Sequence, residues 1–478
     1  MKGKRVLIIN RGEIAIRVAK ALNELGLVSV GVWTDNETEP PHLEYCQEWV
    51  HLEGTNNKET YLDIPKIMKL IDKYKIDGVH PGYGFLSENR EFSETLAKKG
   101  VTFIGPNPTA VYKMGTKDIS KQIAQEAGVP VVPGSKGEVA TVEEAIRIGN
   151  EIGYPILLKA VAGGGGKGMR PCSNESEVKE NFAAVQREAL SSFGYAALLV
   201  EKYILNPHHI EVQILADKKG NVYHMFEREC SIQRRYQKII EEAPSPFIGT
   251  DEAVRKDICE TAVKCAKAVN YDSAGTVEFI MGEDKKFYFL EMNTRIQVEH
   301  PITEEITGVD LVANMIKAAF GEPLDFKSQE EIKIHGHAIE LRICAEDPVT
   351  MLPAPGKIVG FETTFPQGIR FDHCIFQNFT ITPDFDPMIG KLIAKGFNRE
   401  VALRKVRNAL DGLQIDGIKT NIALHKVILD EETFKAGKYS TAYIGKIKPQ
   451  EKVAAKENIE AFMLKIAAIE LNNVGGAV

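Results

Sequence analysis

Two acidic residues on the arms of one predicted hairpin have the types and spacing of a divalent-cation site. The stretch "GTVEFIMGEDKKFYFLEMNTRIQVEH", residues 275–300, can fold about Asp284 and Lys285, which sets Glu278 opposite Glu291. Like charges directly opposite each other on paired strands destabilise by up to about 1 kcal/mol, and a bridging cation turns that repulsion into attraction. Carboxylates with an amide oxygen suit Mg²⁺. For the stretch alone, the alternative is an ordinary half-solvated strand.

The second arm of this hairpin continues with polar residues at every other position. Because side chains alternate along a strand, one face would present a wholly polar set while Met292 and Ile296 face the other way. We expect that polar face to comprise Glu291, Asn293, Arg295, Gln297 and Glu299.

A glycine-rich loop lies in "KAVAGGGGKGMR", residues 159–170, between two apolar, strand-like runs. It is not a P-loop, because Val161 and Gly168 stand where that motif needs Gly and Ser or Thr. Bare glycine amides can wrap phosphate oxygens, and Lys159 and Lys167 add charge. Taken alone, the loop is either a phosphate-binding lid or a flexible surface hairpin.

Further phosphate-binding groups are found near the hairpin. The stretch "RECSIQRRYQKIIEEAPSP" is either a solvated charged strand or an anion clamp. Cations around a magnesium hairpin and under a glycine lid predict an ATP site that transfers a phosphoryl group. The clamp would use Lys117, Lys159, His209, Gln233 and Lys238.

The elements that position these groups begin with about a hundred residues of alternating β-branched runs and amphipathic helices. This βαβ order predicts a doubly wound parallel sheet with ligands at the carboxyl ends of its strands. A helix–strand–loop–helix–strand order over 141–203 predicts a small α+β lid, and a β-rich region starts at "HGHAIELRICAEDP". An amphipathic helix is expected over 451–473. We expect domains at 1–113, 114–330 (lid 132–203) and 331–447, with a helical extension at 448–478.

Composition limits the class of protein. The 478 residues include 59 Lys and Arg against 66 Asp and Glu, which disfavours a surface made for nucleic acid or anionic membrane. Seven scattered cysteines without a CxxC pair indicate reduced thiols and no structural metal. No stretch has the length of a signal-peptide core or a membrane span, so a cytoplasmic protein is expected.

Nine motifs in order resemble those of the biotin carboxylases, the ATP-grasp subunits of biotin-dependent carboxylases, over residues 1 to about 447. They are "NRGEIAIRV", "HPGYGFLSEN", "FIGP", "KAVAGGGGKGM", "EKYILNPHHIEVQ", "SIQRRYQKIIEEAP", "EMNTRIQVEHPITE", "LRICAEDP" and "MIGKLI". The resemblance implies that Mg-ATP phosphorylates bicarbonate to carboxyphosphate, whose CO₂ joins the N1′ nitrogen of biotin. It also implies a pre-ATP-grasp N-terminal domain, an ATP-grasp domain with a lid, and a β-rich C-terminal domain.

The resemblance implies a role for each matching residue. Glu299 would be the general base, kept ionised by Arg295, and Arg342 would stabilise the biotin enolate. Arg295, Gln297 and Val298 would seat bicarbonate, with Lys238 and Arg342 also at the substrates. Mg²⁺ or Mn²⁺ would be held by Glu278, Glu291 and Asn293. The nucleotide would be held by Lys117, Lys159, Gly163, Gly164, Gly165, Gly166, Lys167, Gly168, Met169, Glu201, Lys202, Tyr203, Ile204, His209, Gln233, Tyr236 and Lys238, together with Glu278 and Glu291.

Partners follow from what the chain lacks. The nearest match to the biotinylated Ala-Met-Lys-Met motif, residues 463–466, lies in the predicted helix, so we expect a separate biotin carboxyl carrier protein and a separate carboxyltransferase. A homodimer is expected by family analogy, and the acceptor, a 2-oxoacid or an acyl-CoA, stays open. The alternatives are another ATP-grasp ligase that uses carboxyphosphate and a non-catalytic ATP-binding relative. Tyr236, Thr116, Glu229 and Lys167 depart from the residues usual in the family.

Overall fold

The computed structural model describes residues 1–37, 39–161, 168–193, 195–459 and 463. The N-terminal region is the expected doubly wound sheet, with five parallel strands in the order β3-β2-β1-β4-β5. Alternate residues of β1 face opposite sides: Val6 and Ile8 pack with helix α1, and Leu7 packs with α2 and α3. The elements are β1 (Arg5–Ile8), α1 (Gly12–Glu24), β2 (Val28–Trp33), the 3₁₀ helix η1 (Pro41–Tyr45), β3 (Glu48–His51), α2 (Ile64–Tyr74), β4 (Gly78–His80), α3 (Arg90–Lys99) and β5 (Thr102–Phe103).

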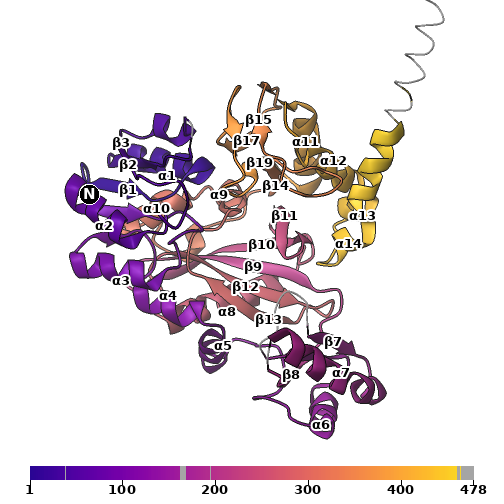
Figure 1. Ribbon diagram of the computed structural model, residues 1–478. Coiled ribbons are helices and arrows are strands. Elements are labelled where there is room, and N and C mark those ends of the chain that lie inside the picture. The colour runs from indigo at the N-terminus through magenta and orange to yellow at the C-terminus, as the bar shows by residue number, and fades with distance from the viewer. Residues whose placement is uncertain (38, 162–167, 194, 460–462, 464–478) are drawn as a thin grey trace, which may run out of the picture.

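Two helices, α4 (Pro108–Gly115) and α5 (Lys117–Glu126), lead to the lid, which has the expected element order with one additional strand, β7, after the glycine loop. Its elements are α6 (Val142–Ile152), β6 (Ile156–Ala160), β7 (Met169–Cys172), α7 (Glu175–Phe193) and β8 (Leu198–Lys202). The strands form a separate sheet in the order β7-β6-β8, and the lid's hydrophobic cluster draws only on residues 139 to 200. In Figure 1 the lid projects from the rest of the molecule, below the central sheet. The lid is therefore a packing unit of its own.

An eight-stranded sheet in the order β13-β12-β9-β10-β11-β14-β19-β17 forms the centre of the molecule. It is antiparallel throughout and continues across the expected domain boundary at 330/331, because β11 pairs with β14. Its strands are β9 (His208–Ala216), β10 (Val222–Arg234), β11 (Gln237–Ala243), β12 (Ala274–Met281), β13 (Phe287–Asn293), β14 (His337–Cys344), β17 (Ile369–His373) and β19 (Met388–Gly396). Helices α8 (Glu252–Ala268), α9 (His300–Thr307) and α10 (Leu311–Ala319) pack against it.

The predicted hairpin is confirmed in register and shortened in length. Glu278 of β12 lies opposite Glu291 of β13, as the predicted fold about Asp284 and Lys285 requires, and the register shifts by one residue between Glu278 and Phe279. The expectation that the strand continues to Glu299 is wrong, because β13 ends at Asn293 and α9 begins at His300. Residues 294–299 instead form an irregular connection, with a bend and a turn, between β13 and α9.

The C-terminal region adds helices to the expected strands. Its remaining elements are η2 (Gln329–Glu331), β15 (Gly356–Lys357), β16 (Gly360–Thr363), β18 (Thr380–Ile381), α11 (Arg399–Asp411), β20 (Leu413–Asp416), α12 (Ile422–Asp430), α13 (Glu432–Lys435) and α14 (Tyr443–Ile447). Residues 449–459 are helical, and Ile459 is exposed; Phe462, Ile466 and Ile469 of the expected stripe lie outside the described residues. All seven cysteines are free thiols. Within the described ranges, no helix is both long and apolar enough to cross a bilayer.

Candidate functional site

The facing carboxylates of the hairpin lie in a charged environment, where Glu278 is buried and Glu291 is exposed. Glu278 is buried and accepts hydrogen bonds from Asn293 Nδ2 at 2.8 Å and Gln297 Nε2 at 2.7 Å. His209 Nε2 also lies 2.8 Å from Glu278 Oε2. Burial, followed by the charge of Glu278, raises the pKa of Glu291. A second carboxylate placed here is therefore short of positive charge, which is what a divalent cation would supply.

Lys238 connects the charged groups of the site, although the cationic stretch in which it lies suggested only an anion clamp. Its ammonium lies 3.0 Å from Glu278 Oε1 and 2.6 Å from Glu299 Oε1, and it also pairs with Glu211. Burial alone would lower the pKa of Lys238, but these carboxylates outweigh it and raise that pKa well above its ordinary value. Lys238 is thus a permanent cation that joins the hairpin to Glu299.

Glu299 is a buried carboxylate held between two cations. It pairs with Lys238 and accepts a hydrogen bond from Arg342 Nη2 at 3.0 Å. Burial would raise the pKa of Glu299, but Lys238, Arg342 and Arg228 hold it well below the usual range. The ionised state was expected, but its cause was misassigned, because Arg295 instead contacts Glu88 and Asn293, each at 2.9 Å.

Two other predicted site residues, Gln297 and Val298, lie in the connection after β13 and not on a strand. Gln297 donates to Glu278 and accepts from Arg228 Nη2 at 2.6 Å. The carbonyl of Val298 accepts from Lys391 Nζ at 2.9 Å. One buried cation thus holds the side chain of Gln297, and another holds the backbone of Val298.

Several groups that organise the site were missed by sequence reasoning. Arg228 is fully buried and binds Glu211 at 2.6 Å, Gln213 at 2.7 Å and Thr303 at 3.0 Å. Its signal in the sequence was weak: alternating charged residues on two predicted strands, "HIEVQ" and "FERE", that proved to be neighbours. Buried ion pairs between strands leave no periodic pattern that identifies the partners.

The predicted nucleotide groups are less tightly fixed. His209 is half-buried, and Gln233 Nε2 lies 2.8 Å from its Nδ1. Burial would lower the pKa of His209, but the carboxylate of Glu278 raises it. Lys159 lies 3.6 Å from Glu201, and Lys117 is exposed at the start of α5. His209 thus contacts the hairpin at Glu278, and the charge of Lys117 acts on Glu291.

The expected hinge and lid residues are placed as follows. Lys202 donates to the carbonyls of Gly153 and Tyr154, each at 2.9 Å, and Tyr203 donates its amide to Pro155. Gly168 donates its amide to Glu188, and Met169 begins β7. The side chain of Tyr236 is 76% exposed at the β10–β11 turn, and Ile204 directly follows Tyr203. Gly163, Gly164, Gly165, Gly166 and Lys167 lie outside the described residues.

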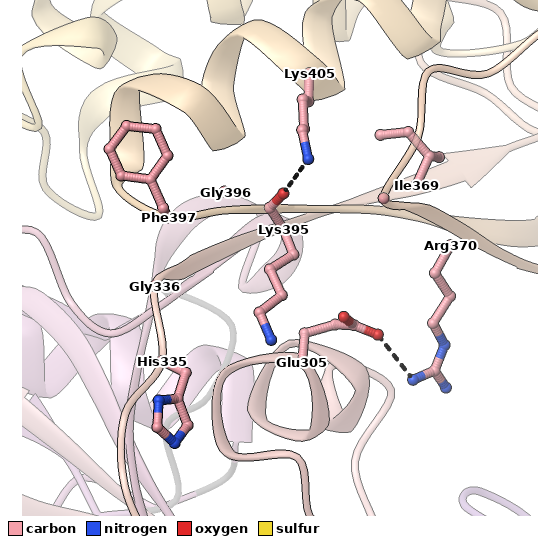
Figure 2. A pocket seen from close by; sticks show the side chains of 10 residues that line it. Glu305, His335, Gly336, Ile369, Arg370, Lys395, Gly396, Phe397 and Lys405 are labelled. Carbon is pink, nitrogen blue, oxygen red and sulfur yellow. Dashed lines mark hydrogen bonds and ion pairs between the residues drawn. The ribbon is translucent and has the colours of Figure 1, made fainter.

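Two cavities differ in their relation to this cluster. One of about 380 Å³ lies beside Arg342 and is also lined by Tyr83, Gly84 and Val298. A larger one of about 580 Å³, lined by Glu305, His335, Arg370, Lys395 and Phe397, contains none of the predicted site residues (Figure 2). Size alone would have selected the wrong cavity.

Known proteins resemble this chain along nearly its whole length. Family models match in sequence: the N-terminal domain of biotin carboxylase over residues 2–111, the ATP-binding domain of the carbamoyl-phosphate synthase L chain over 116–327, and the C-terminal domain of biotin carboxylase over 340–446. A biotin carboxylase of Halalkalibacterium halodurans is 45% identical over 92% of this chain and 97% of the relative.

A solved structure and a longer relative add further similarities. The biotin carboxylase domain of the 2-oxoglutarate carboxylase of Hydrogenobacter thermophilus, a dimer in complex with MgADP, ADP and bicarbonate, is 46% identical, with a TM-score of 0.83 over 94% of this chain and 99% of that one. The propionyl-CoA carboxylase alpha chain of Ruegeria pomeroyi is 45% identical over 93% of this chain and 68% of the relative.

Proposed function

Because the chain belongs to the biotin carboxylase family, we propose that Glu299 is the general base of a reaction in which Mg-ATP and bicarbonate carboxylate biotin. The enzyme is an ATP-dependent ligase. One observation supports this assignment above the others: a carboxylate that is buried yet ionised lies between Lys238 and Arg342, beside two facing carboxylates. A general base must be ionised and close to the proton that it removes.

The donor set of the hairpin fits Mg²⁺ or Mn²⁺. Glu278 and Glu291 supply two carboxylates, Asn293 supplies an amide oxygen, and the raised pKa of Glu291 marks uncompensated negative charge. When bound there, the metal would neutralise charge on the nucleotide phosphates. His209, Gln233, Lys117, Lys159 and Gly163 to Gly168 would hold those phosphates, with Met169 and Tyr236 beside them and Glu201 to Ile204 at the adenine.

Bicarbonate would be seated at the end of β13. Arg295 offers a planar fork for a carboxylate-like anion, and its Nε already donates to the carboxylate of Glu88 at 2.9 Å. Gln297 and Val298 would complete the seat, since both are fixed by buried cations. Glu299 would accept the proton of bicarbonate while a bicarbonate oxygen attacks the γ-phosphorus of ATP. The products of this step are carboxyphosphate and ADP.

Biotin would enter through the cavity beside Arg342. The guanidinium would stabilise the negative charge that develops on the ureido oxygen as N1′ gives its proton to the phosphate released from carboxyphosphate and bonds to the CO₂ released with it. We propose that biotin arrives on a separate carrier protein and that a separate carboxyltransferase uses the product, because relatives of this length are named biotin carboxylase. The acceptor, a 2-oxoacid or an acyl-CoA, would then be selected by the partner.

The assembly and the domain division are also proposals. A homodimer is supported by the dimer described for the Hydrogenobacter thermophilus domain. The divisions 1–113, 114–330, 331–447 and 448–478 are supported by the family models, which end and begin near these positions. A cytoplasmic location stays a prediction.

The first test is phosphate release from Mg-ATP by the purified chain, with and without bicarbonate and free biotin. We expect release to need bicarbonate, to rise with biotin, and to fall about 10²- to 10⁴-fold in Glu299→Gln, the range for losing a general base. Glu305→Gln, on the same helix but outside the cluster, should retain the activity. ATP binding with no response to bicarbonate would overturn the assignment in favour of an ATP-binding relative or another ATP-grasp ligase.

A further inference from the structure

Arg342 donates hydrogen bonds to two carboxylates, each from a different nitrogen atom. Its Nε donates to Glu241 Oε1 at 2.6 Å, and its Nη2 donates to Glu299 Oε2 at 3.0 Å. Within the described part of the chain, Nη1 makes no hydrogen bond, and Arg342 lines the cavity of about 380 Å³. The two carboxylates thus leave one N–H edge of the guanidinium for a ligand in that cavity.

Glu241, which the predicted site did not include, has an unused oxygen. The Oε2 atom of Glu241 is buried and has no hydrogen-bond partner among the described residues. Glu340 lies directly opposite Glu241 across β11 and β14, is fully buried, and has no partner there on either oxygen. Two buried, facing carboxyls with three unpaired oxygens cannot both be ionised at small cost, so the pair holds a proton in part of the accessible pH range.

The charges around Glu241 come from several elements. Arg342 and Glu340 face it from β14, Glu299 from the start of α9, Lys238 from its own strand and Cys230 from β10, with Lys391 of β19 next to Glu340. Burial, opposed by Arg342 and reinforced by Glu299, raises the pKa of Glu241 to about 7. Burial also raises the pKa of Glu340 well above its ordinary value. Glu340 is therefore neutral when Glu241 ionises.

We propose that Glu241 is a positioning residue. Its ionisation determines whether Arg342 pairs with both Glu241 and Glu299 or with Glu299 alone. When Glu241 is ionised, it holds Nε and keeps the Nη1 edge turned to the cavity. When Glu241 is neutral, Glu299 is the only anion left to pair with Arg342. A stronger pairing with Arg342 makes Glu299 a weaker base and withdraws the guanidinium from the second substrate.

This inference rests on the proposed function and deepens it. It assigns the carboxylation site an internal acidic control at a residue that touches neither substrate. Biotin carboxylation should then be slowed below neutral pH by more than the supply of bicarbonate alone explains.

The test compares the wild-type chain with Glu241→Gln, which imitates the neutral carboxyl. At each pH both proteins are assayed at the same bicarbonate concentration. The pH dependence of the bicarbonate–CO₂ equilibrium therefore does not affect the ratio of their biotin carboxylation rates. We expect a ratio of about 1 to 3 at about pH 6 and about 10 to 100 at about pH 8.5, since only the wild type gains the second anion. A ratio that does not change with pH, whether large or close to 1, overturns the proposal, because a merely structural role would cost the same at every pH.

Glu340→Gln is the matched control on the facing strand. Glu340 makes no hydrogen bond with any described residue, so its ratio to wild type should stay flat and near 1. Difference infrared spectroscopy gives a readout independent of turnover: a protonated-carboxyl band should titrate near neutral pH in wild type and in Glu340→Gln. Absence of that band from wild type overturns the proposal even if Glu241→Gln fails to fold. Wild-type protein without bicarbonate-dependent turnover would instead refute the proposed function.

Discussion

The end of the central sheet and the lid hold their cations in opposite ways. At the end of the sheet, Lys238, Arg228 and Arg342 are each paired with buried carboxylates on neighbouring strands or on α9. In the lid, Lys159 is 33% exposed and its nearest carboxylate, on Glu201, is 3.6 Å away. The sheet belongs to the main body of the molecule, whereas the lid packs around its own core.

We infer from this difference that the end of the sheet serves the chemical step and that the lid serves nucleotide binding. Electrostatic stabilisation of a transition state requires groups that are already in place, because reorganisation during the reaction costs free energy. A site that must admit and release a nucleotide needs cations that are not already neutralised. The paired cluster should therefore determine rate and stability, and the lid should determine nucleotide affinity.

The largest expected effect comes from breaking the paired cluster at Lys238. Lys238→Met leaves Glu211, Glu278 and Glu299 without their shared cation, and loss of one partner of a buried pair costs about 3–5 kcal/mol. We expect the free energy of unfolding in urea to fall by that amount and bicarbonate-dependent phosphate release to fall at least about 10²-fold.

Lys256→Met provides the control, because Lys256 is a largely exposed lysine on α8 whose nearest carboxylate is also exposed. Its effect on the free energy of unfolding should stay within about 0.5 kcal/mol. Similar unfolding curves for the two variants would show that the cluster is not a source of stability.

Sequence reasoning located the hairpin because a fold about Asp284 and Lys285 sets Glu278 opposite Glu291, and the structure has this pair in register. Alternation along the strand then predicted which side chains share a face. It failed beyond Asn293, where the polar alternation continues but the backbone turns into α9. It could not find Arg228 or Glu241, because their partners lie on strands whose neighbours are fixed only by tertiary packing.

A smaller effect on activity is expected at the proposed metal site of the hairpin. Glu291→Gln removes one predicted ligand and one of two facing charges, so the fold should lose little stability. We expect the Mg²⁺ concentration for half-maximal phosphate release to rise about 10- to 100-fold, an effect of the size seen when metal sites lose supporting groups.

Mn²⁺ binding followed by electron paramagnetic resonance checks the same variant without turnover. Glu283→Gln, near the turn of the same hairpin, should bind Mn²⁺ as the wild type does. Equal Mn²⁺ affinity in Glu291→Gln and wild type would remove Glu291 from the metal site.

The smallest effect on stability, with a clear effect on binding, is expected in the lid. Lys159→Gln removes a cation that has only a distant partner, so the free energy of unfolding should change by less than about 0.5 kcal/mol. Because a hydrogen bond to a charged group contributes about 1.5–3 kcal/mol, the KM for ATP should rise about 10- to 100-fold while kcat at saturating ATP changes far less. Lys136→Gln, an exposed lysine of the lid, should change neither quantity. A fall in kcat with an unchanged KM would place Lys159 among the reacting groups, and the division between a catalytic sheet and a binding lid would no longer hold.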